Sequence, residues 1–451
     1  MKQLPKILQV GKFYPPDLGG IERVMQDICD AFNAQGFICD VLCSNSGKYF
    51  KLDILDSKAR IYRTKSYGKL ASTSVTPQMI YFLRNLARSY DILHLHLPDP
   101  MANLALICAN LRDKKIILHW HSDIIKQKHL LKLYKPLQSW LLKRADTIIG
   151  TSPKYIEQSK TLQAYRHKCI SIPLGTTPFA PQSLAPQSLT PKNPKRLLAM
   201  GRFVRYKGFE YAIRAMEFLP EDYHLSINGD GALKQELHNL ITALRLENRV
   251  SINNPGFLSS KQLCQKYAKH GILVLPSFSK NESFGLVQIE AMSYGVPVVS
   301  CAIEGSGVDW VNEHGYSGIV VPPKDPRALA RAVEQIVKNY EFYSANALRR
   351  FQAHFTKEKM IDSLKELYIR LLRGGAYEKL ISIFLAAHPA PIAHPYTHRA
   401  KPPLAHIIRP NTKSTESKAL AIDSLSSCAY HIGYIRTPPL HSSNPTTRTA
   451  V

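Results

Sequence analysis

One stretch of this sequence says most about how the chain folds. An apolar run at Gly271–Leu275, which predicts a buried strand, ends in a loop at Pro276 and is followed by SKNESFGLVQIEAM at residues 279–292. We expect a helix to begin near Ser283, with the backbone amides of the next residues at its positive end. A strand that passes through a loop into a helix is the repeating unit of a parallel sheet.

Two carboxylates flank the expected start of this helix. Glu282 lies just before it and Glu290 lies within it, so the helical rise separates the two by roughly 12 Å. That is about the span from the sugar to the ribose of a nucleotide sugar, and a diphosphate would then lie over the amides of Phe284, Gly285 and Leu286. The plain alternative is one capping glutamate and one solvated helical glutamate.

Outward from this stretch, expected strands and helices alternate along most of the chain. Strands are expected at 6–10, 37–43, 91–95, 115–119, 147–150 and 169–172, and again at 196–200, 223–227, 249–252, 271–275, 296–300 and 318–321. Two helices are expected at 341–355 and 357–372. Repeated βα units predict an α/β fold with parallel sheets that carry helices on both faces.

Two segments interrupt this alternation. Residues 176–195 are rich in Pro, Ser, Thr and Gln, which is typical of a linker. From residue 375 to 451, Pro, His, Ser and Thr dominate and acidic residues nearly vanish, so we expect a disordered tail. The 451 residues are therefore read as two α/β domains with a linker and a tail.

Composition limits the classes of partner. The formal net charge of +25 indicates an anionic partner, such as nucleic acid, an acidic membrane surface or a phosphorylated ligand. The eight cysteines form no C-x-x-C pair, and we interpret them as reduced and mostly buried. Neither a signal peptide nor an apolar run of about 20 residues is found, so a soluble or peripheral cytoplasmic protein is expected.

Two further clusters follow expected strands and could meet phosphate. Gly19 and Gly20 precede a helix, where paired glycines let the backbone approach an anion, although most such pairs are only turns. Arg202 and Lys207 follow the strand at 196–200 and could both reach a diphosphate between the domains. The alternative for these two is a pair of solvated basic residues, which a chain this basic makes equally plausible.

These motifs together resemble those of glycosyltransferase family four. The resemblance rests on Glu-x₇-Glu with Phe-Gly-Leu inside, on Leu-Pro-Ser before it and Gly-Val-Pro-Val-Val after it, and on the clusters at Gly19-Gly20, Gly201-Arg202, Lys207-Gly208 and 228–231. It covers residues 5–372. The family implies the GT-B architecture, in which two Rossmann-like domains face each other across a cleft, and transfer that retains the anomeric configuration of the sugar.

The resemblance also implies domain limits and residue roles. Residues 1–175 would form the acceptor domain, 176–195 the linker, 196–355 the donor-binding domain and 356–374 a C-terminal helix. Glu290 would hold the ribose hydroxyls and Glu282 would contact the donor sugar. Arg202 and Lys207 would neutralise the leaving diphosphate, and Gly20, with Gly19, would belong to the loop that closes over it. His121 best fits the histidine that the family places beside the reacting carbon.

Histidine pairs offer a metal site as a competing interpretation. His94 with His96, and His119 with His121, each place two imidazoles on one face of an expected strand. Neutral hydrogen-bonded histidines explain these pairs better, because no acidic cluster accompanies them. The D-x-D sequence of metal-dependent transferases of the other major fold is absent, so we expect neither a metal nor another cofactor.

The sequence also departs from the family pattern. Where the family usually has Gly-Gly and then Glu, this chain reads EGSGVDWV at 304–311, a variant that resembles bacterial mannosyl- and rhamnosyltransferases of surface-polysaccharide synthesis, as does TSPKY at 151–155. GDP-mannose is therefore the favoured donor, with UDP-glucose, UDP-galactose or UDP-N-acetylglucosamine as alternatives. A glycan or lipid-diphosphate-linked acceptor is expected. Basic residues between 112 and 144, interleaved with apolar ones, suggest contact with the inner face of an anionic membrane.

Three other functions compete with this interpretation. A sugar-nucleotide epimerase of the same architecture would act on the donor without an acceptor, and the family-four motif argues against it. A nucleic-acid-binding protein would explain the charge, but no zinc-finger spacing or RNA-binding aromatic motif supports it. A scaffold that lost catalysis is disfavoured because Glu282, Glu290, Arg202 and Lys207 are all present.

Overall fold

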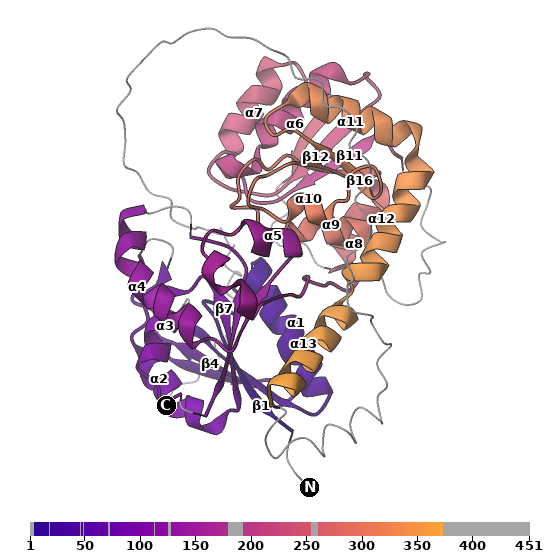
Figure 1. The fold of residues 1–451 in the computed structure, drawn as a ribbon. Coiled ribbons are helices and arrows are strands. Elements are labelled where there is room, and N and C mark those ends of the chain that lie inside the picture. Colours follow the sequence, from indigo (N-terminus) through magenta and orange to yellow (C-terminus); the bar gives the residue numbers. More distant parts are fainter. Residues whose placement is uncertain are drawn as a thin grey trace, which may run out of the picture.

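The chain forms two lobes, and a C-terminal helix returns from the second lobe to the first (Figure 1). The computed structural model describes residues 4–17, 19–45, 47, 49–70, 73–111, 113–124, 128–178, 193–253 and 260–372. The expected tail at 375–451 and most of the expected linker lie outside these residues.

The N-terminal lobe is built on an eight-stranded sheet in the order β10-β9-β8-β7-β1-β2-β4-β3. All neighbouring strands pair in parallel except β3 and β4, which are antiparallel. The strands are β1 Lys6–Val10, β2 Ile38–Ser44, β3 Lys51–Ile54, β4 Arg60–Thr64, β7 Ile92–Leu97, β8 Lys115–Trp120, β9 Thr147–Gly150 and β10 Cys169–Ser171. The helices are α1 Gly20–Ala34, α2 Gln78–Leu86, α3 Pro100–Ile107, α4 Lys128–Arg144 and α5 Pro153–Gln158, and β5 Lys69–Leu70 pairs with β6 Thr73–Ser74.

The C-terminal lobe is built on a six-stranded parallel sheet in the order β13-β12-β11-β14-β15-β16. Its strands are β11 Arg196–Met200, β12 His224–Asn228, β13 Val250–Asn253, β14 Ile272–Leu275, β15 Val298–Cys301 and β16 Gly318–Val321. Its helices are α6 Phe209–Ala215, α7 Lys234–Ala243, α8 Ser260–Lys269, α9 Leu286–Met292, α10 Val308–Val311, α11 Pro326–Lys338 and α12 Tyr340–His354. The parallel order reverses direction between β11 and β14, which is where ligands bind in such sheets.

The last described helix, α13 (Lys357–Leu372), returns to the N-terminal lobe and packs on α1 (Figure 1). The Tyr368 ring lies 5.0 Å from the Phe32 ring, and Lys357 Nζ forms an ion pair with Asp27 Oδ1 at 2.9 Å. Tyr368 is fully buried and contacts the central sheet through His94. The packing of α13 therefore helps to hold the two lobes together.

The sequence explains the starts of several helices. Pro100, Pro153 and Pro326 occupy the first helical turn, where proline needs no amide partner. Side-chain oxygens of the preceding Asp99, Ser152 and Asp325 accept hydrogen bonds from first-turn amides that have no partner within the helix. Central strands such as β9, β14 and β15 are apolar runs buried on both faces, as parallel strands covered by helices must be, whereas the edge strand β3 is mostly exposed.

The expected α/β fold with two parallel sheets is confirmed, and most strand limits differ by one or two residues from the prediction. Four strands were missed: β5 and β6 have two residues each, β3 is a four-residue, mostly exposed edge strand, and β4 lies next to it. The helix expected near Ser283 begins at Leu286 instead. Gly285 at its N-cap has φ of +76°, a left-handed conformation that delays the helix by three residues. The separation expected between Glu282 and Glu290 was calculated from the helical rise per residue. That rise does not apply to residues 282–285, because they precede the helix.

Candidate active site

The residues selected from the sequence gather at the carboxyl ends of strands in both lobes. The loop that follows β1 and ends at Gly19, here called the glycine loop, leads into α1 at Gly20. His121 follows β8, Arg202 follows β11, and the Glu282 loop follows β14. The lobes touch there, because a Cβ added to Gly20 would lie 2.9 Å from Leu286 Cδ1 across the interface. This is the edge at which doubly wound sheets bind their ligands.

Lys207 and Glu282 form a nearly buried ion pair at the centre of this region. Lys207 Nζ lies 2.5 Å from Glu282 Oε2, with about 11% of each side chain exposed, and the Ser277 hydroxyl donates to the same carboxylate oxygen at 3.0 Å. Burial alone would lower the pKa of Lys207, but the Glu282 carboxylate and the Tyr206 hydroxyl raise it overall. Lys207 is therefore a stable cation at neutral pH.

Arg202 adds a second cation beside Lys207. It lies close enough to oppose the protonation of Lys207 and of Lys12, and to favour the ionised form of Glu22. Lys12 and Glu22 belong to the N-terminal lobe, so Arg202 faces across the interface. An anion that entered between the lobes would meet Arg202 and Lys207 together.

Backbone groups surround the start of α9. The Phe284 side chain is 3% exposed and packs edge-on against Phe355, so this residue can offer a ligand only its backbone. At Gly285 the positive φ favours glycine, and an added Cβ would lie 2.9 Å from both Gln288 Nε2 and Leu275 Cδ2, so these side chains would have to shift. Leu286 is partly buried and touches the glycine loop of the opposite lobe.

Glu290 lies on α9 and is held by the C-terminal lobe. The hydroxyl of Tyr267, on α8, donates to Glu290 Oε2 at 2.8 Å. Burial raises the pKa of Glu290, while Tyr267 and the positive charge of Arg23 on α1 act in the opposite direction. Because Arg23 belongs to the N-terminal lobe, Glu290 also faces the interface.

The glycine loop depends on contacts that sequence reasoning missed. Arg63, on β4, donates to the carbonyls of Tyr14 (3.0 Å) and Pro15 and pairs with Asp53 on β3 at 2.6 Å. The only sequence signal would have been recognition of the edge strand β3 and of its neighbour β4. The loop then ends at Gly19, whose extended backbone suits any residue but whose missing Cβ leaves room for the Glu22 carboxylate.

Lys12 and Glu22 also escaped the sequence prediction. Burial lowers the pKa of Lys12, with Asp99 and Glu22 opposing that shift. Burial raises the pKa of Glu22, and its own backbone hydrogen bond and Lys12 oppose that shift. The available sequence signal was position: Lys12 lies shortly after β1, and Glu22 lies in the first turn of α1, close to Gly19 and Gly20.

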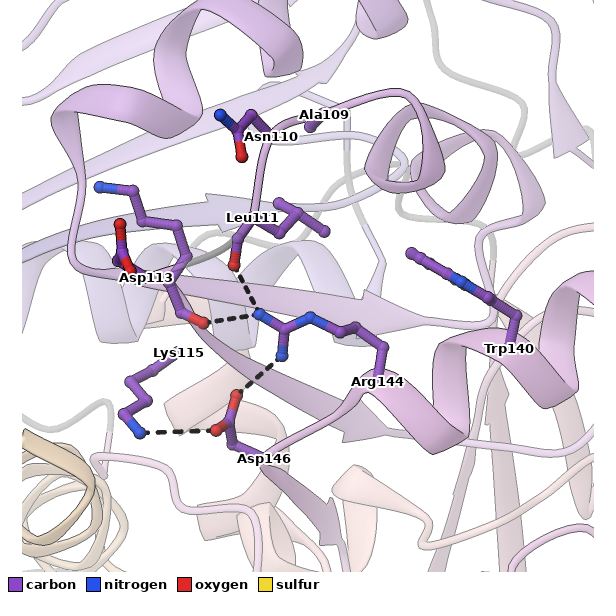
Figure 2. A pocket seen from close by; sticks show the side chains of 9 residues that line it. Ala109, Asn110, Leu111, Asp113, Lys115, Trp140, Arg144 and Asp146 are labelled. Atoms are coloured by element: carbon purple, nitrogen blue, oxygen red, sulfur yellow. Dashed lines mark hydrogen bonds and ion pairs between the residues drawn. The ribbon is translucent and has the colours of Figure 1, made fainter.

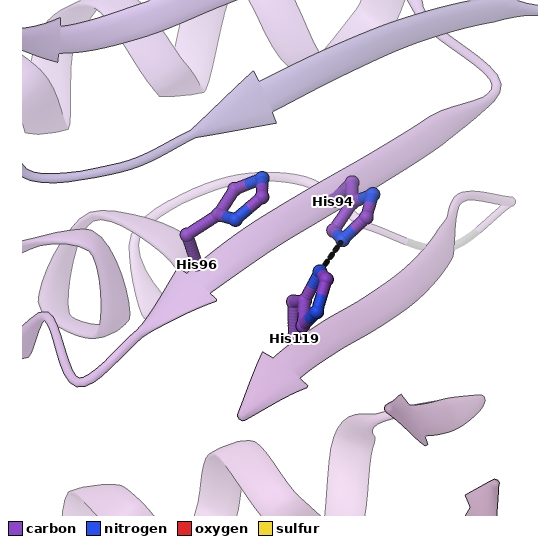
Figure 3. A group of neighbouring side chains, drawn as sticks. All are labelled: His94, His96 and His119. Atoms are coloured by element: carbon purple, nitrogen blue, oxygen red, sulfur yellow. Dashed lines mark hydrogen bonds between the residues drawn. The ribbon is translucent and has the colours of Figure 1, made fainter. Parts of the chain in front are cut away.

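The four strand-end histidines form a buried group below the interface. His94 Nε2 lies 3.3 Å from His119 Nδ1 (Figure 3), and His96 Nδ1 lies 3.0 Å from His121 Nε2. Burial lowers the pKa of all four, so they are neutral at pH 7. Nitrogens of His94, His96 and His119 lie within 4.8 Å of one another and could hold a metal, but a metal there would have to replace the His94–His119 hydrogen bond.

A separate cavity of about 530 Å³ lies at the opposite edge of the N-terminal sheet (Figure 2). It surrounds Lys115 at the start of β8, whereas His121 follows the end of that strand. Its cations all have partners: Arg144 donates to the carbonyls of Leu111 and Lys114 and to Asp146, Lys115 pairs with Asp146, and Lys114 donates to the carbonyl of Arg88. This cavity contains none of the residues selected from the sequence for the donor site, but Lys114, Lys115 and Arg144 belong to the basic segment expected to contact a membrane.

Comparison with known proteins first defines the class by fold. The structure aligns with sucrose-phosphate synthase from Thermosynechococcus elongatus at a TM-score of 0.67 and 22% identity, over 82% of this chain and all of that one. It also aligns with Anabaena HepE in complex with UDP at a TM-score of 0.62 and 21% identity, over 80% and 99% of the two chains. The fold is therefore GT-B, as predicted.

Sequence comparison then gives the family. Residues 18–178 match the model named Glycosyltransferase Family 4, and residues 182–351 match that of Glycosyl transferases group 1. The O-antigen chain mannosyltransferase C of Escherichia coli is 31% identical, over 82% of this chain and 99% of the relative. The D-rhamnosyltransferase WbpZ of Pseudomonas aeruginosa is also 31% identical, over 78% and 92%. The chain belongs to this family of glycosyltransferases, which confirms the resemblance found in the sequence.

Proposed function

We propose that this glycosyltransferase moves a hexose from a nucleotide-diphosphate sugar to a glycan or lipid-linked acceptor, with retention of anomeric configuration and without a metal. The observation that carries this proposal is the buried Lys207–Glu282 pair beside the start of α9, with Arg202 adjacent. Cations and backbone amides at that point suit a diphosphate, and a carboxylate next to them suits a sugar that develops positive charge.

In this mechanism the protein stabilises separating charges. Breaking the bond between sugar and phosphate leaves negative charge on the diphosphate, which Arg202, Lys207 and the amides near Gly285 would neutralise at an interface shielded from water. Glu282 would exchange its partner Lys207 for the sugar as the diphosphate takes up the lysine. The acceptor hydroxyl would attack from the side on which the diphosphate leaves, and that phosphate would accept the proton.

Other residues are proposed to bind the ribose end and the sugar end of the donor. Glu290, held by Tyr267 and facing Arg23, would bind the ribose hydroxyls. His121 would lie beside the reacting carbon, and Gly19 and Gly20 would close over the diphosphate. The contact between Gly20 and Leu286 supports this closure, because the glycine loop already reaches the start of α9.

GDP-mannose is the donor that the relatives favour, because one is named a mannosyltransferase and another a D-rhamnosyltransferase. A UDP-sugar is the alternative, since HepE was solved with UDP-glucose. Thermal stabilisation by GDP-mannose, UDP-glucose, UDP-galactose and UDP-N-acetylglucosamine would decide between them. We expect the largest rise in Tm with GDP-mannose; a larger rise with a UDP-sugar would reverse the assignment, and no rise with any would reject the donor class.

Stereochemistry and metal dependence have direct tests. The one-bond ¹³C–¹H coupling at the anomeric carbon of the product, measured by NMR, should show that the transferred sugar keeps the configuration it has in the donor. Turnover should persist in EDTA, because cations of the chain itself would neutralise the diphosphate. An inverted product, or activity lost in EDTA and restored by a divalent cation, would contradict the corresponding part of the proposal.

The acceptor side of the proposal places α4 on an anionic membrane. The helix exposes Leu133 and Trp140 seven residues apart, on one face, with Lys132 and Lys143 beside that face and Lys135 exposed farther around the helix. Apolar side chains flanked by lysines suit an acidic lipid surface, with each lysine worth about 1 kcal/mol. Within the described ranges, no helix is both long and apolar enough to cross a bilayer.

Liposome flotation tests this surface. Binding should require acidic lipid and should weaken when Lys132, Lys135 and Lys143 are changed to Gln. A matched control changes three exposed cations elsewhere, Arg331, Lys338 and Lys359, to Gln. An equal loss of liposome binding in both triple variants would indicate attraction by net charge alone. Equal binding to acidic and to neutral liposomes would reject the proposed membrane role.

A further inference from the structure

A chain of hydrogen bonds leads from the backbone of α1 to His121. Gln9 lies on β1, at the centre of the N-terminal sheet, and is fully buried. Its Nε2 donates to the carbonyl of Met25 at 3.0 Å, and its Oε1 lies 3.0 Å from His96 Nε2. His96 Nδ1 in turn lies 3.0 Å from His121 Nε2.

The direction of every bond in this chain follows from its first member. A backbone carbonyl can only accept a hydrogen bond, so Gln9 must turn its amide nitrogen toward Met25 and its oxygen toward His96. That oxygen also only accepts, so His96 must carry a proton on Nε2. The Nδ1 atom of a neutral His96 is then unprotonated and accepts, and His121 must donate from Nε2.

This deduction holds only if His96 and His121 are both uncharged, and their burial keeps them so. His96 is 1% exposed and His121 is 5% exposed. Burial lowers the pKa of His96 and of His121, and the neighbouring His94 and His119 lower both further. Each ring therefore carries one proton, and a proton on Nε2 of His121 leaves its Nδ1 bare.

We propose that Gln9 and His96 are positioning residues that hold His121 in the tautomer protonated at Nε2, so that His121 can meet the substrate only through the accepting Nδ1. The proposal rests on the proposed function, which puts His121 beside the donor sugar. A bare Nδ1 selects a group that donates, and on a sugar that group is a hydroxyl. His121 would thus orient the donor through one hydroxyl and would disfavour a donor with fluorine in that place.

Two variants of Gln9 separate this role from simple packing. In Gln9→Glu, burial and the Met25 carbonyl favour the protonated acid, whose hydroxyl donates to Met25 while its other oxygen still accepts from His96 Nε2, so the tautomer of His121 is preserved. In Gln9→Leu, a side chain of similar size has no acceptor, so His96 can move its proton to Nδ1 and force the other tautomer on His121. The two variants fill the same buried position but differ in this one bond.

The direct measurement is long-range ¹H–¹⁵N NMR on the full chain with ¹⁵N-labelled histidine and without any nucleotide sugar. The His121 signals are assigned by their loss in His121→Asn. We expect protonation at Nε2 in the wild type and in Gln9→Glu, and a shift toward Nδ1 in Gln9→Leu. A proton on Nδ1 of His121 in the wild type would overturn the inference, as would a His121 signal that is the same in Gln9→Leu.

Kinetics give a second readout that a packing role would not produce. We expect kcat/KM of Gln9→Leu to be roughly tenfold below that of Gln9→Glu, the worth of one hydrogen bond. Equal losses in the two variants would overturn the positioning role. Because the NMR experiment needs no substrate, an Nε2-protonated His121 in a protein that turns over no nucleotide sugar would reject the proposed function alone.

Discussion

Lys154 on α5 and Asp309 on α10 form an ion pair between the two lobes, through Lys154 Nζ and Asp309 Oδ2. Close by, the amide of Gly305 donates to Gln158 Oε1 at 2.8 Å. Lys154 belongs to the segment 151–155, and Gly305 and Asp309 to the segment 304–311, in which the sequence resembles bacterial mannosyl- and rhamnosyltransferases. Segments about 150 residues apart thus meet at one point of the interface.

Lys154→Met should loosen the lobes more than it destabilises either one. About 34% of the lysine side chain is exposed, so we expect no more than about 1 kcal/mol of stability to be lost. Donor affinity, measured by calorimetry, should fall because the binding-competent arrangement is less populated. Lys195→Met is the matched control, since Lys195 pairs with Asp222 within the C-terminal lobe. Equal effects of both on donor affinity would exclude a role of the interface pair.

Lys207→Met should cost about 3–5 kcal/mol of stability, because it leaves the Glu282 carboxylate nearly buried and unpaired. Adding Glu282→Gln should recover much of that loss, since the double variant carries no uncompensated charge. Urea unfolding of the wild type, both single variants and the double variant gives the coupling energy. Additive losses would show that the two side chains do not interact.

Glu290→Ala and Arg202→Ala should affect different steps. Glu290→Ala should weaken donor binding, because it removes the carboxylate proposed to hold the ribose. Arg202→Ala should mainly lower kcat, by roughly 100-fold if it stabilises charge that develops only in the transition state. Calorimetry and initial rates separate the two effects. Unchanged donor affinity and turnover in both variants would refute the proposed donor site.

Glu290→Gln should raise stability at neutral pH. Burial raises the pKa of Glu290 above the ordinary value of 4.5, so the folded chain binds this proton more tightly than the unfolded chain does. The cost of ionising Glu290 is therefore absent below pH 4.5 and grows as pH rises through the folded pKa. The Tm difference between variant and wild type should follow that rise; a difference independent of pH would contradict it.

Gly285→Ala should destabilise the start of α9 in two ways. The positive φ costs about 1–2 kcal/mol in alanine, and the new methyl group would press on Leu275 at a further cost of about 1–3 kcal/mol. Gly315→Ala is the matched control, because Gly315 has φ of +78° and open space around its Cβ position. Equal losses of unfolding free energy in the two variants would show that crowding plays no part.

The sequence by itself determined the two sheets and the place, at the carboxyl ends of their strands, of most residues proposed to bind the donor. Alternating apolar runs and helical stretches reflect local periodicity, and the motif residues lie at the carboxyl ends of strands, where topology alone brings them to one edge. This is why Arg202, Lys207, Glu282 and Glu290 could be selected before any contact was known. The individual roles of these residues stay predictions.

Only the tertiary structure decided how those residues are partnered. The Lys207–Glu282 pair, the Tyr267–Glu290 bond and the link from Gln9 to His121 each join residues on different elements, so no local pattern encodes them. The left-handed Gly285 moved the helix start, because a single backbone angle outweighed the helical propensity of the residues before it. Hydrogen-bond direction and proton position follow from three-dimensional neighbours, and a linear sequence does not specify them.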